Sequence, residues 1–238
     1  MKVLALDSSA TSASVALVDN EFILGEFYIN TSLTHSQTLM MMVKSLLDNT
    51  KTNVEDIDAF AVSVGPGSFT GVRIGVSAIK GMAYALNKPC IPVSTLYAMA
   101  FNLSGLGDSL ICAVMDARCN QVYNAFFNIF NGSIDRIEED RAIKIEDLKN
   151  DILNKYNNKI INLVGDGANL CYNNLNKEIP NLRLLPGHLL YQRAYGVSQA
   201  SINLYNKGAF LSASDLNPVY LRMPQAQREL RKKSKLLF

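Results

Sequence analysis

The chain has 238 residues, of which 48% are hydrophobic and 18% charged, with a formal net charge of +2. This balance is typical of a folded globular protein with one large domain or two small lobes, and the small charge gives no ground for nucleic-acid binding by itself. No stretch approaches the roughly 18 uninterrupted apolar residues of a membrane helix. Asp7 interrupts the apolar start of the chain before any signal-peptide cleavage site. We therefore expect a cytoplasmic protein without membrane contact.

The residues that most often hold metals are scarce or badly spaced. The four cysteines include no CxxC pair, which leaves a zinc or redox site with little support. The two histidines, His35 and His188, are too few for a histidine-based metal site or a catalytic triad. We therefore expect no metal, no cofactor and no catalytic histidine.

The first 103 residues predict one lobe that alternates strands with helices. Short apolar runs broken by polar turns indicate strands, and longer runs with capping residues indicate helices. The predicted elements, in chain order, are three strands within 2–29, a helix at 35–48, a strand at 58–64, a helix at 72–86, a strand at 90–93 and a helix from Thr95 capped by Ser94.

The segment SGLGDS, residues 104–109, breaks this pattern, which then begins again. The predicted elements are strands at 110–115, 121–130 and 160–164 and helices at 145–156 and 188–206. Asp7 and Asp116 hold equivalent places, because each ends an apolar strand that precedes a polar tip and an alternating strand. This repeat predicts a duplicated α/β fold of the actin, sugar-kinase and Hsp70 kind. We predict a first lobe at 1–103, a second at 104–222 and a basic tail at 223–238.

The stretch SVGPGSFTGVRIG, residues 63–75, follows a predicted strand and precedes a predicted helix, as phosphate loops do. A Walker A loop requires four residues between its glycine and a final Gly-Lys, but Gly65 and Gly71 are separated by five and Val72 follows. Thr70 occupies the place of the third glycine in a dinucleotide-binding fingerprint. Neither phosphate motif is met.

A structural role explains the stretch better. Gly65 and Gly67 permit positive φ angles at a tight turn, and Ser68 or Thr70 is predicted to cap the following helix. Small residues follow at helical spacing. Glycines inside a helix cost roughly 1 kcal/mol each relative to alanine, so we expect this bare helix face to pack closely against another helix or a sheet.

The methionine-rich helix at 35–48 has more apolar surface than one face requires. One stripe is formed by Leu39, Met42, Val43 and Leu46, and Met40, Met41 and Leu47 extend it. Two apolar faces favour two neighbours, namely the core and a partner, although an ordinary buried helix pair is the alternative. The candidate partner contacts on this helix and on the helix at 72–86 are His35, Leu39, Met42, Val43, Leu46, Arg73, Val76 and Lys80.

The segment from Val62 to Ala100, which contains GPGSFTGVRIG, resembles the TsaB (YeaZ) family. Further segments agree in order: LALDSSATSASVAL, THSQTLMMMVKSLLD, AVMDARCNQVYNAFF, VGDGA and NPVYLR, so that the resemblance spans nearly the whole chain. The resemblance implies the two-lobed actin and Hsp70 fold (ASKHA) with ribonuclease-H-like lobes and a shortened second lobe. It also implies a part in forming N6-threonylcarbamoyladenosine (t6A), the modified base beside the tRNA anticodon.

The resemblance further implies a scaffold and not a transferase. The implied partner is a TsaD-type transferase bound through helices 35–48 and 72–86, with a TsaE-type ATPase in a larger complex and a possible homodimer on the same surface. In the transferase two histidines hold a metal, and the matching positions here are Thr95 and Met99. A hydroxyl and a thioether are poor substitutes for imidazole, so we expect neither transferase nor metallopeptidase chemistry.

ATP use remains an alternative at this point. In ATP-using proteins of this architecture a glycine two residues after the first aspartate lets backbone amides approach the phosphates, and Ser9 stands there in this chain. The candidates for nucleotide or magnesium contact are Asp7, Ser9 and Asp116. A contact between tRNA phosphates and the basic tail is also open, beside the plainer alternative of a solvated chain end.

Overall fold

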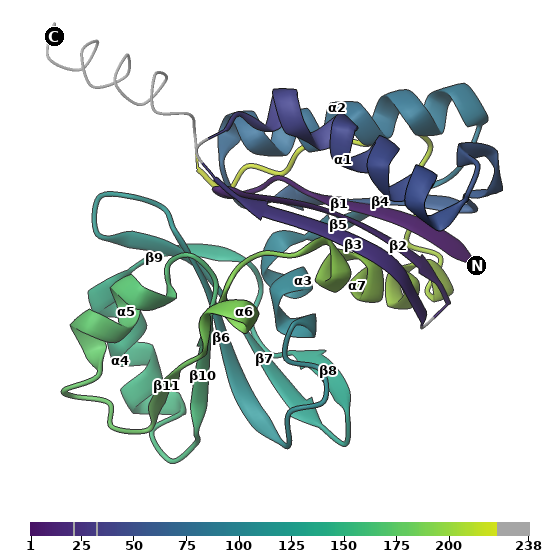
Figure 1. Ribbon diagram of the computed structural model, residues 1–238. Helices are drawn as coiled ribbons and strands as arrows, with labels where there is room; N and C mark the ends of the chain where they lie inside the picture. The colour runs from purple at the N-terminus through teal and green to yellow at the C-terminus, as the bar shows by residue number, and fades with distance from the viewer. Residues whose placement is uncertain (21, 32, 223–238) are drawn as a thin grey trace, which may run out of the picture.

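Figure 1 shows the computed structural model, which describes residues 1–20, 22–31 and 33–222. Two lobes lie side by side, and each is a mixed β-sheet with helices packed against it. The basic tail predicted at 223–238 lies outside the described residues.

The first lobe contains a five-stranded sheet in the order β3-β2-β1-β4-β5, in which β1 is antiparallel to β2 and parallel to β4. Helices cover both faces, which explains why β4 is buried at every position and reads as a continuous apolar run. The elements are β1 (Lys2–Asp7), β2 (Ser12–Asp19), β3 (Phe22–Asn30), α1 (His35–Thr50), η1 (Val54–Asp56), β4 (Ala59–Gly65), α2 (Phe69–Leu86), β5 (Cys90–Ser94) and α3 (Thr95–Phe101).

The second lobe contains a sheet in the order β11-β10-β6-β7-β8, with β9 also paired to β7. Helices α4 and α5 pack on one face of this sheet around a second hydrophobic core. The elements are β6 (Ser109–Asp116), β7 (Gln121–Phe130), β8 (Ser133–Arg136), β9 (Arg141–Lys144), α4 (Ile145–Lys155), β10 (Ile161–Val164), α5 (Ala168–Leu175), β11 (Leu182–Leu184), α6 (Gly187–Leu190) and α7 (Ala194–Asn206).

The two lobes repeat one plan, which confirms the predicted duplication. Each begins with antiparallel strands and continues with helix, parallel strand, helix and parallel strand. The second copy is shorter, because α4 and α5 have 11 and 8 residues where α1 and α2 have 16 and 18. The glycine loops also match: VGPGS at 64–68 corresponds to VGDGA at 164–168, and Gly65 and Gly165 both have positive φ, at 121° and 110°.

The lobes exchange one helix each, which corrects the predicted boundary. Helix α3 continues from the first lobe but packs on the second sheet, beside β6 and β7. Helix α7 follows the second lobe but packs on the free face of the first sheet, and the chain then stays with the first lobe, where Val219 donates its amide to Val64 O at 2.8 Å. The second lobe therefore does not extend to residue 222 as predicted.

Three predicted details of the elements differ in the structure. Helix α2 begins at Phe69 and not at residue 72, because Ser68 is the cap and accepts a hydrogen bond from Gly71 N at 3.2 Å. The helix predicted at 188–206 is divided into α6 and α7. Strands β8, β9 and β11 are three or four residues long, too short for a periodic signal to predict them.

The small-residue face of α2 packs closely against the turn between β1 and β2, which confirms the predicted close approach. A Cβ on Gly71 would lie 2.1 Å from Ser8 O, and one on Gly67 would lie 2.4 Å from Ser9 O. Gly67 does not have the positive φ expected for it, so the need for glycine there is steric. The close neighbours are the backbone of this turn and, at Gly75, the side chain of Val62 in β4, 3.3 Å from an added Cβ, so the expected approach to the sheet is present as well.

This contact gives a stability prediction with a matched control in the same helix. Gly71→Ala should lower the free energy of unfolding by about 2–3 kcal/mol, because the new methyl group meets a backbone oxygen that cannot rotate away. Gly81→Ala should raise it by about 0.5–1 kcal/mol, since a Cβ there meets nothing within 4 Å and alanine favours helix. Urea denaturation of the two variants checks both signs, and equal effects would contradict the packing described.

Candidate functional site

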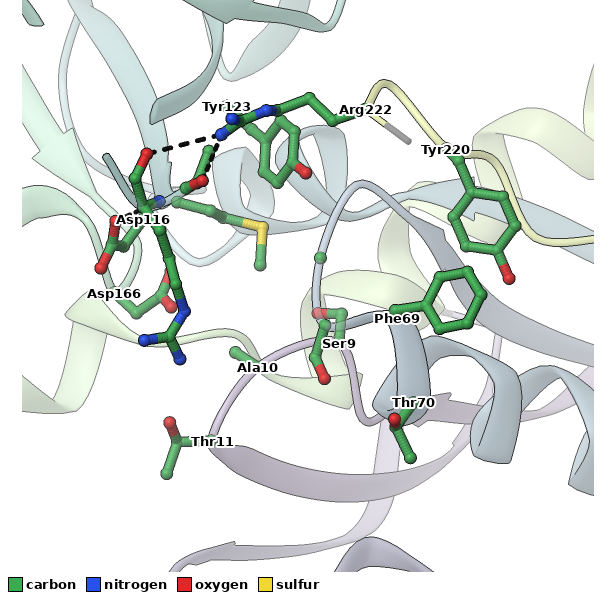
Figure 2. A pocket seen from close by; sticks show the side chains of 15 residues that line it. Ser9, Ala10, Thr11, Phe69, Thr70, Asp116, Tyr123, Asp166, Tyr220 and Arg222 are labelled. Carbon is green, nitrogen blue, oxygen red and sulfur yellow. Dashed lines mark hydrogen bonds between the residues drawn. The ribbon is translucent and has the colours of Figure 1, made fainter. Parts of the chain in front are cut away.

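A cleft of about 510 Å³ separates the lobes at the carboxyl ends of their central strands. Figure 2 shows its walls, which come from the β1–β2 turn, the start of α2, the β6–β7 turn and the last described residues of the chain. The lining is polar where the second lobe forms the wall and aromatic where Phe69 and Tyr220 lie. The residues that face it most clearly are Ser9, Thr11, Phe69, Thr70, Asp116, Tyr123, Asp166, Tyr220 and Arg222.

Asp7, the first candidate for a magnesium or nucleotide contact, does not line the cleft. Its side chain is 1% exposed, and one carboxylate oxygen accepts hydrogen bonds from Ser9 N at 2.9 Å and Ser9 Oγ at 2.8 Å. The other oxygen accepts a hydrogen bond from Ser63 Oγ. Burial raises the pKa of Asp7, and these hydrogen bonds oppose that effect. Asp7 therefore holds the turn together, and in this arrangement it presents no free carboxylate oxygen to the cleft.

Ser9 lines the cleft, but its backbone groups are already used. Its amide donates to Asp7, and its carbonyl oxygen accepts a hydrogen bond from Ser68 N at 2.6 Å. A phosphate needs free amides that point at it. The amide of Ser9 is therefore not available to a phosphate as the turn stands.

Asp116 does line the cleft, as expected, and a second carboxylate lies near it. Asp116 is exposed at the end of β6, and its Oδ1 accepts a hydrogen bond from Arg118 N at 2.7 Å. Asp166 follows β10, the parallel neighbour of β6, and accepts a hydrogen bond from Gln192 Nε2 at 3.0 Å. Burial raises the pKa of Asp166. Sequence reasoning did not select Asp166, although the match of VGDGA to VGPGS was a signal that could have placed it in the cleft.

Five of the eight candidate partner contacts are buried in the first lobe's own core. Leu39, Met42, Val43 and Leu46 face the sheet from α1, and Val76 faces it from α2. The stripe they form covers the sheet, so their assignment to a partner surface is corrected.

The second apolar face of α1 does lie outside the core. Met40 is 47% exposed and Met41 is 70% exposed. A groove of about 580 Å³ runs between α1 and α2, lined by His35, Met40, Phe69, Arg73, Ile74 and others. His35 is half-buried, and its Nε2 lies 2.7 Å from Ala10 O. Leu39 of the predicted stripe borders this groove, while the exposed apolar side chains of α1 are Met40 and Met41.

The two candidate cations on α2 bind the chain's own C-terminal segment. Arg73 Nε donates to the Tyr220 hydroxyl at 2.7 Å, and Lys80 Nζ donates to the carbonyl oxygens of Ser214 and Leu216 at 2.9 and 3.1 Å. Arg73 also lines the α1–α2 groove. Lys80 is taken up by intramolecular contacts.

The positions that would carry a transferase metal do not fit one. Thr95 and Met99 are buried at the start of α3, and Met99 Sδ packs so closely on the second-lobe loop that a Cβ on Gly165 would lie 3.0 Å from it. Thr95 Oγ1 has no hydrogen-bond partner, but a neutral hydroxyl beside a thioether is a weak donor set for a transition metal. Among the described residues, no group of three His, Cys, Asp or Glu side chains is placed to hold a metal ion.

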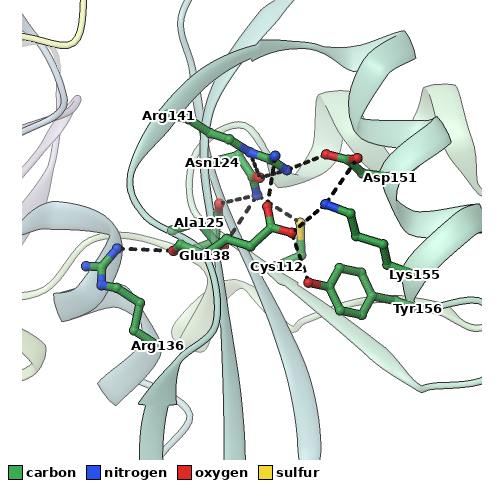
Figure 3. Close-up of polar contacts among 10 residues, drawn as sticks. Cys112, Asn124, Ala125, Arg136, Glu138, Arg141, Asp151, Lys155 and Tyr156 are labelled. Carbon is green, nitrogen blue, oxygen red and sulfur yellow. Dashed lines mark hydrogen bonds and ion pairs between the residues drawn. The ribbon is translucent and has the colours of Figure 1, made fainter.

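A second polar cluster lies inside the second lobe and is structural (Figure 3). Arg141 binds Glu138 and Asp151, each at 2.8 Å, and donates to the buried Asn124 Oδ1 at 3.0 Å. Lys155 completes the cluster by binding Glu138 at 3.0 Å. Every charge in this cluster faces an opposite charge, so it ties β7, β9 and α4 together without leaving a group to bind a ligand.

Comparison with known proteins agrees with the two-lobed architecture. A family profile described as "TsaD: tRNA N6-adenosine threonylcarbamoyltransferase" matches residues 29–176. The protein described as component A of (R)-2-hydroxyglutaryl-CoA dehydratase from Acidaminococcus fermentans shares the fold, with a TM-score of 0.50 over 88% of this chain and 99% of that chain at 11% identity. Within the part of the chain that the structure describes, no helix is both long and apolar enough to cross a membrane.

Two proteins are similar over almost their whole lengths. The crystal structure described as YeaZ from Pseudomonas aeruginosa matches with a TM-score of 0.76 and 26% identity, over 92% of this chain and 99% of that chain. The Escherichia coli protein named tRNA threonylcarbamoyladenosine biosynthesis protein TsaB is 31% identical over 97% of this chain and 98% of its own length. The chain therefore belongs to the TsaB (YeaZ) family, within the wider group that the TsaD profile describes.

Proposed function

We propose that this chain is a non-catalytic subunit of the cytoplasmic machinery that forms t6A in tRNA, and that it binds and supports a TsaD-type transferase. The observation that carries the proposal is the similarity, over 97% of the chain, to a protein named for threonylcarbamoyladenosine biosynthesis. A TsaE-type ATPase joins the larger complex in this proposal, and a homodimer uses the same face when the transferase is absent.

The packing of α3 supports the part of the proposal that gives this chain no catalytic activity. Thr95 and Met99 stand where the transferase has its metal-binding histidines, and Met99 fills the space beside Gly165 with its own sulfur atom. Substitution back to histidine would have to displace this packing. The chain keeps the fold of the transferase group and, in our proposal, has lost its reaction.

The partner face in our proposal is the outer surface of α1 and α2, defined here by the groove between them and by Met40 and Met41. Exposed methionines adapt to several partners because the side chain is unbranched and flexible. Met40 and Met41 are adjacent and exposed on a helix whose other face already covers a core, and they extend the apolar lining of the groove.

The partner face gives a prediction that separates binding from folding. Met40→Asp and Met41→Asp together should weaken the complex with a TsaD-type transferase at least about tenfold, because two charges must then be buried against an apolar partner. Isothermal titration calorimetry of the two purified proteins measures the change. The variant's melting temperature should stay close to that of the wild type, since both side chains are exposed.

The matched control is Phe130→Asp, which changes an exposed apolar side chain (55% exposed) in the second lobe. It should leave the affinity for the transferase unchanged. Leu46→Asp is unsuitable as a test, because Leu46 is in the core and the charge would unfold the lobe. Wild-type affinity in the Met40/Met41 variant would show that the partner binds another face.

Reconstitution tests the proposed role directly. Formation of t6A from threonylcarbamoyl-adenylate, tRNA and a TsaD-type transferase should fall to background when this chain is omitted and return when it is added. Incubation of this chain alone with the adenylate and tRNA should give no t6A. Transfer by this chain alone would contradict the non-catalytic role, and full activity without it would contradict the supporting role.

A nucleotide-binding ATPase or kinase is the second candidate, favoured only by the cleft and its two carboxylates, Asp116 and Asp166. The turn that would have to hold the phosphates is closed by the hydrogen bonds from Ser9 to Asp7. We expect titration of the pure protein with ATP and Mg²⁺ to give a Kd weaker than about 1 mM. Binding in the micromolar range would revive this candidate.

A further inference from the structure

The segment from Ala213 to Arg222, named here the strap, lies along α2 and then reaches the mouth of the cleft (Figures 1 and 2). Its Leu216 is fully buried in the core of the first lobe, and Lys80 holds the carbonyl oxygen of that residue at 3.1 Å. Further along, Val219 N donates to Val64 O at the end of β4. The strap is therefore fixed to the first lobe over most of its length.

Near the cleft, Tyr220 of the strap packs against two side chains at the start of α2, Phe69 and Arg73. The rings of Tyr220 and Phe69 lie 4.9 Å apart, and the guanidinium of Arg73 lies 3.8 Å from the Phe69 ring centroid while its Nε binds the Tyr220 hydroxyl. The loop below makes room for the strap, because a Cβ on Gly65 would lie 2.4 Å from Val219 O. The glycine motif thus serves the strap as well as the β1–β2 turn.

Arg222 leaves the first lobe and binds the second. Its guanidinium donates to the carbonyl oxygen of Ala117 and, at 3.4 Å, to that of Arg118, both in the β6–β7 turn. Figure 2 shows these two hydrogen bonds crossing from the strap to the second-lobe wall of the cleft. The strap is bound to the first lobe, and its Arg222 therefore links the first lobe to the backbone of the second by hydrogen bonds from a charged donor.

We propose that Arg222 is a latch, meaning that its hydrogen bonds hold the two lobes at a fixed separation. The packing of Tyr220 on Arg73 and Phe69, called the seat here, positions Arg222 for these bonds. The latch holds the β6–β7 turn at one distance from the start of α2 and so sets the aperture of the cleft. Release of either end lets the lobes rotate apart about their two covalent connections. This inference stands on intramolecular contacts and is independent of the proposed function.

The interlobe distance can be measured with two spin labels on the full chain. Lys44→Cys on α1 and Asn150→Cys on α4 place one label on each lobe at exposed positions, and Cys119→Ser removes the exposed native thiol. The other native cysteines are buried, and burial raises the pKa of Cys171 to about 12, so they stay unlabelled. Pulsed double electron–electron resonance then gives the distance distribution.

In this background Arg222→Ala and Arg73→Gln should both broaden the distribution and lengthen its mean, while the control Arg183→Ala, an exposed arginine on β11, should leave it unchanged. Arg222→Ala should also speed amide hydrogen exchange at Gln121, which closes the β6–β7 turn onto Arg118 O, by about tenfold. Distributions that superimpose on that of the parent protein for Arg222→Ala would overturn the latch, and for Arg73→Gln would overturn the seat. Unchanged melting temperatures establish that either variant has kept its fold.

Discussion

The close approach of the glycine loop to the β1–β2 turn is the contact on which the rest of the first lobe depends. Ser68 N binds Ser9 O at 2.6 Å, and no side chain larger than hydrogen fits at Gly67 or Gly71. This contact fixes where α2 begins, encloses Asp7 and takes up the backbone of Ser9. The space around this loop and the amide of Ser9 are therefore used by the protein's own contacts, although the loop resembles a phosphate site in its glycines and in its place between a strand and a helix.

The second lobe repeats this contact, which makes it a property of the duplicated fold. A Cβ on Gly165 would lie 2.0 Å from Val114 O, and one on Gly167 would lie 2.9 Å from the backbone of Met115, the residue before Asp116. Each loop thus presses on the first hairpin of its own lobe. The difference lies in the aspartates: Asp7 is enclosed, whereas Asp116 is exposed to the cleft. Among the residues that the structure describes, the carboxylates that line the cleft, Asp116 and Asp166, both come from the second lobe.

The order of elements could be predicted from sequence because the long elements have strong periodicity, and the capping roles of Ser68 and Ser94 follow from local chemistry. The orientation of α1 could not, since a helix with two apolar faces does not indicate which face the core takes. The strap has no periodic pattern, so only the structure shows that Arg73 is engaged by residues far along the chain. The role in t6A biosynthesis could be predicted from family resemblance. Which side chains of α1 and α2 are exposed depends on packing and needed the structure.

The exchange of α3 and α7 constrains the inner and outer faces of this fold differently. Each helix fills the inner side of the other lobe's sheet, so neither sheet is covered on both faces by its own lobe alone. A substitution in α3 or α7 must therefore fit the packing of both lobes. The outer helices, α1 and α2 in the first lobe and α4 and α5 in the second, each pack on the core of their own lobe only. Their opposite side faces solvent, where side chains such as Met41 can change with little effect on folding. The solvent side of the outer helices can therefore vary more freely in sequence than the side of each sheet that faces the other lobe.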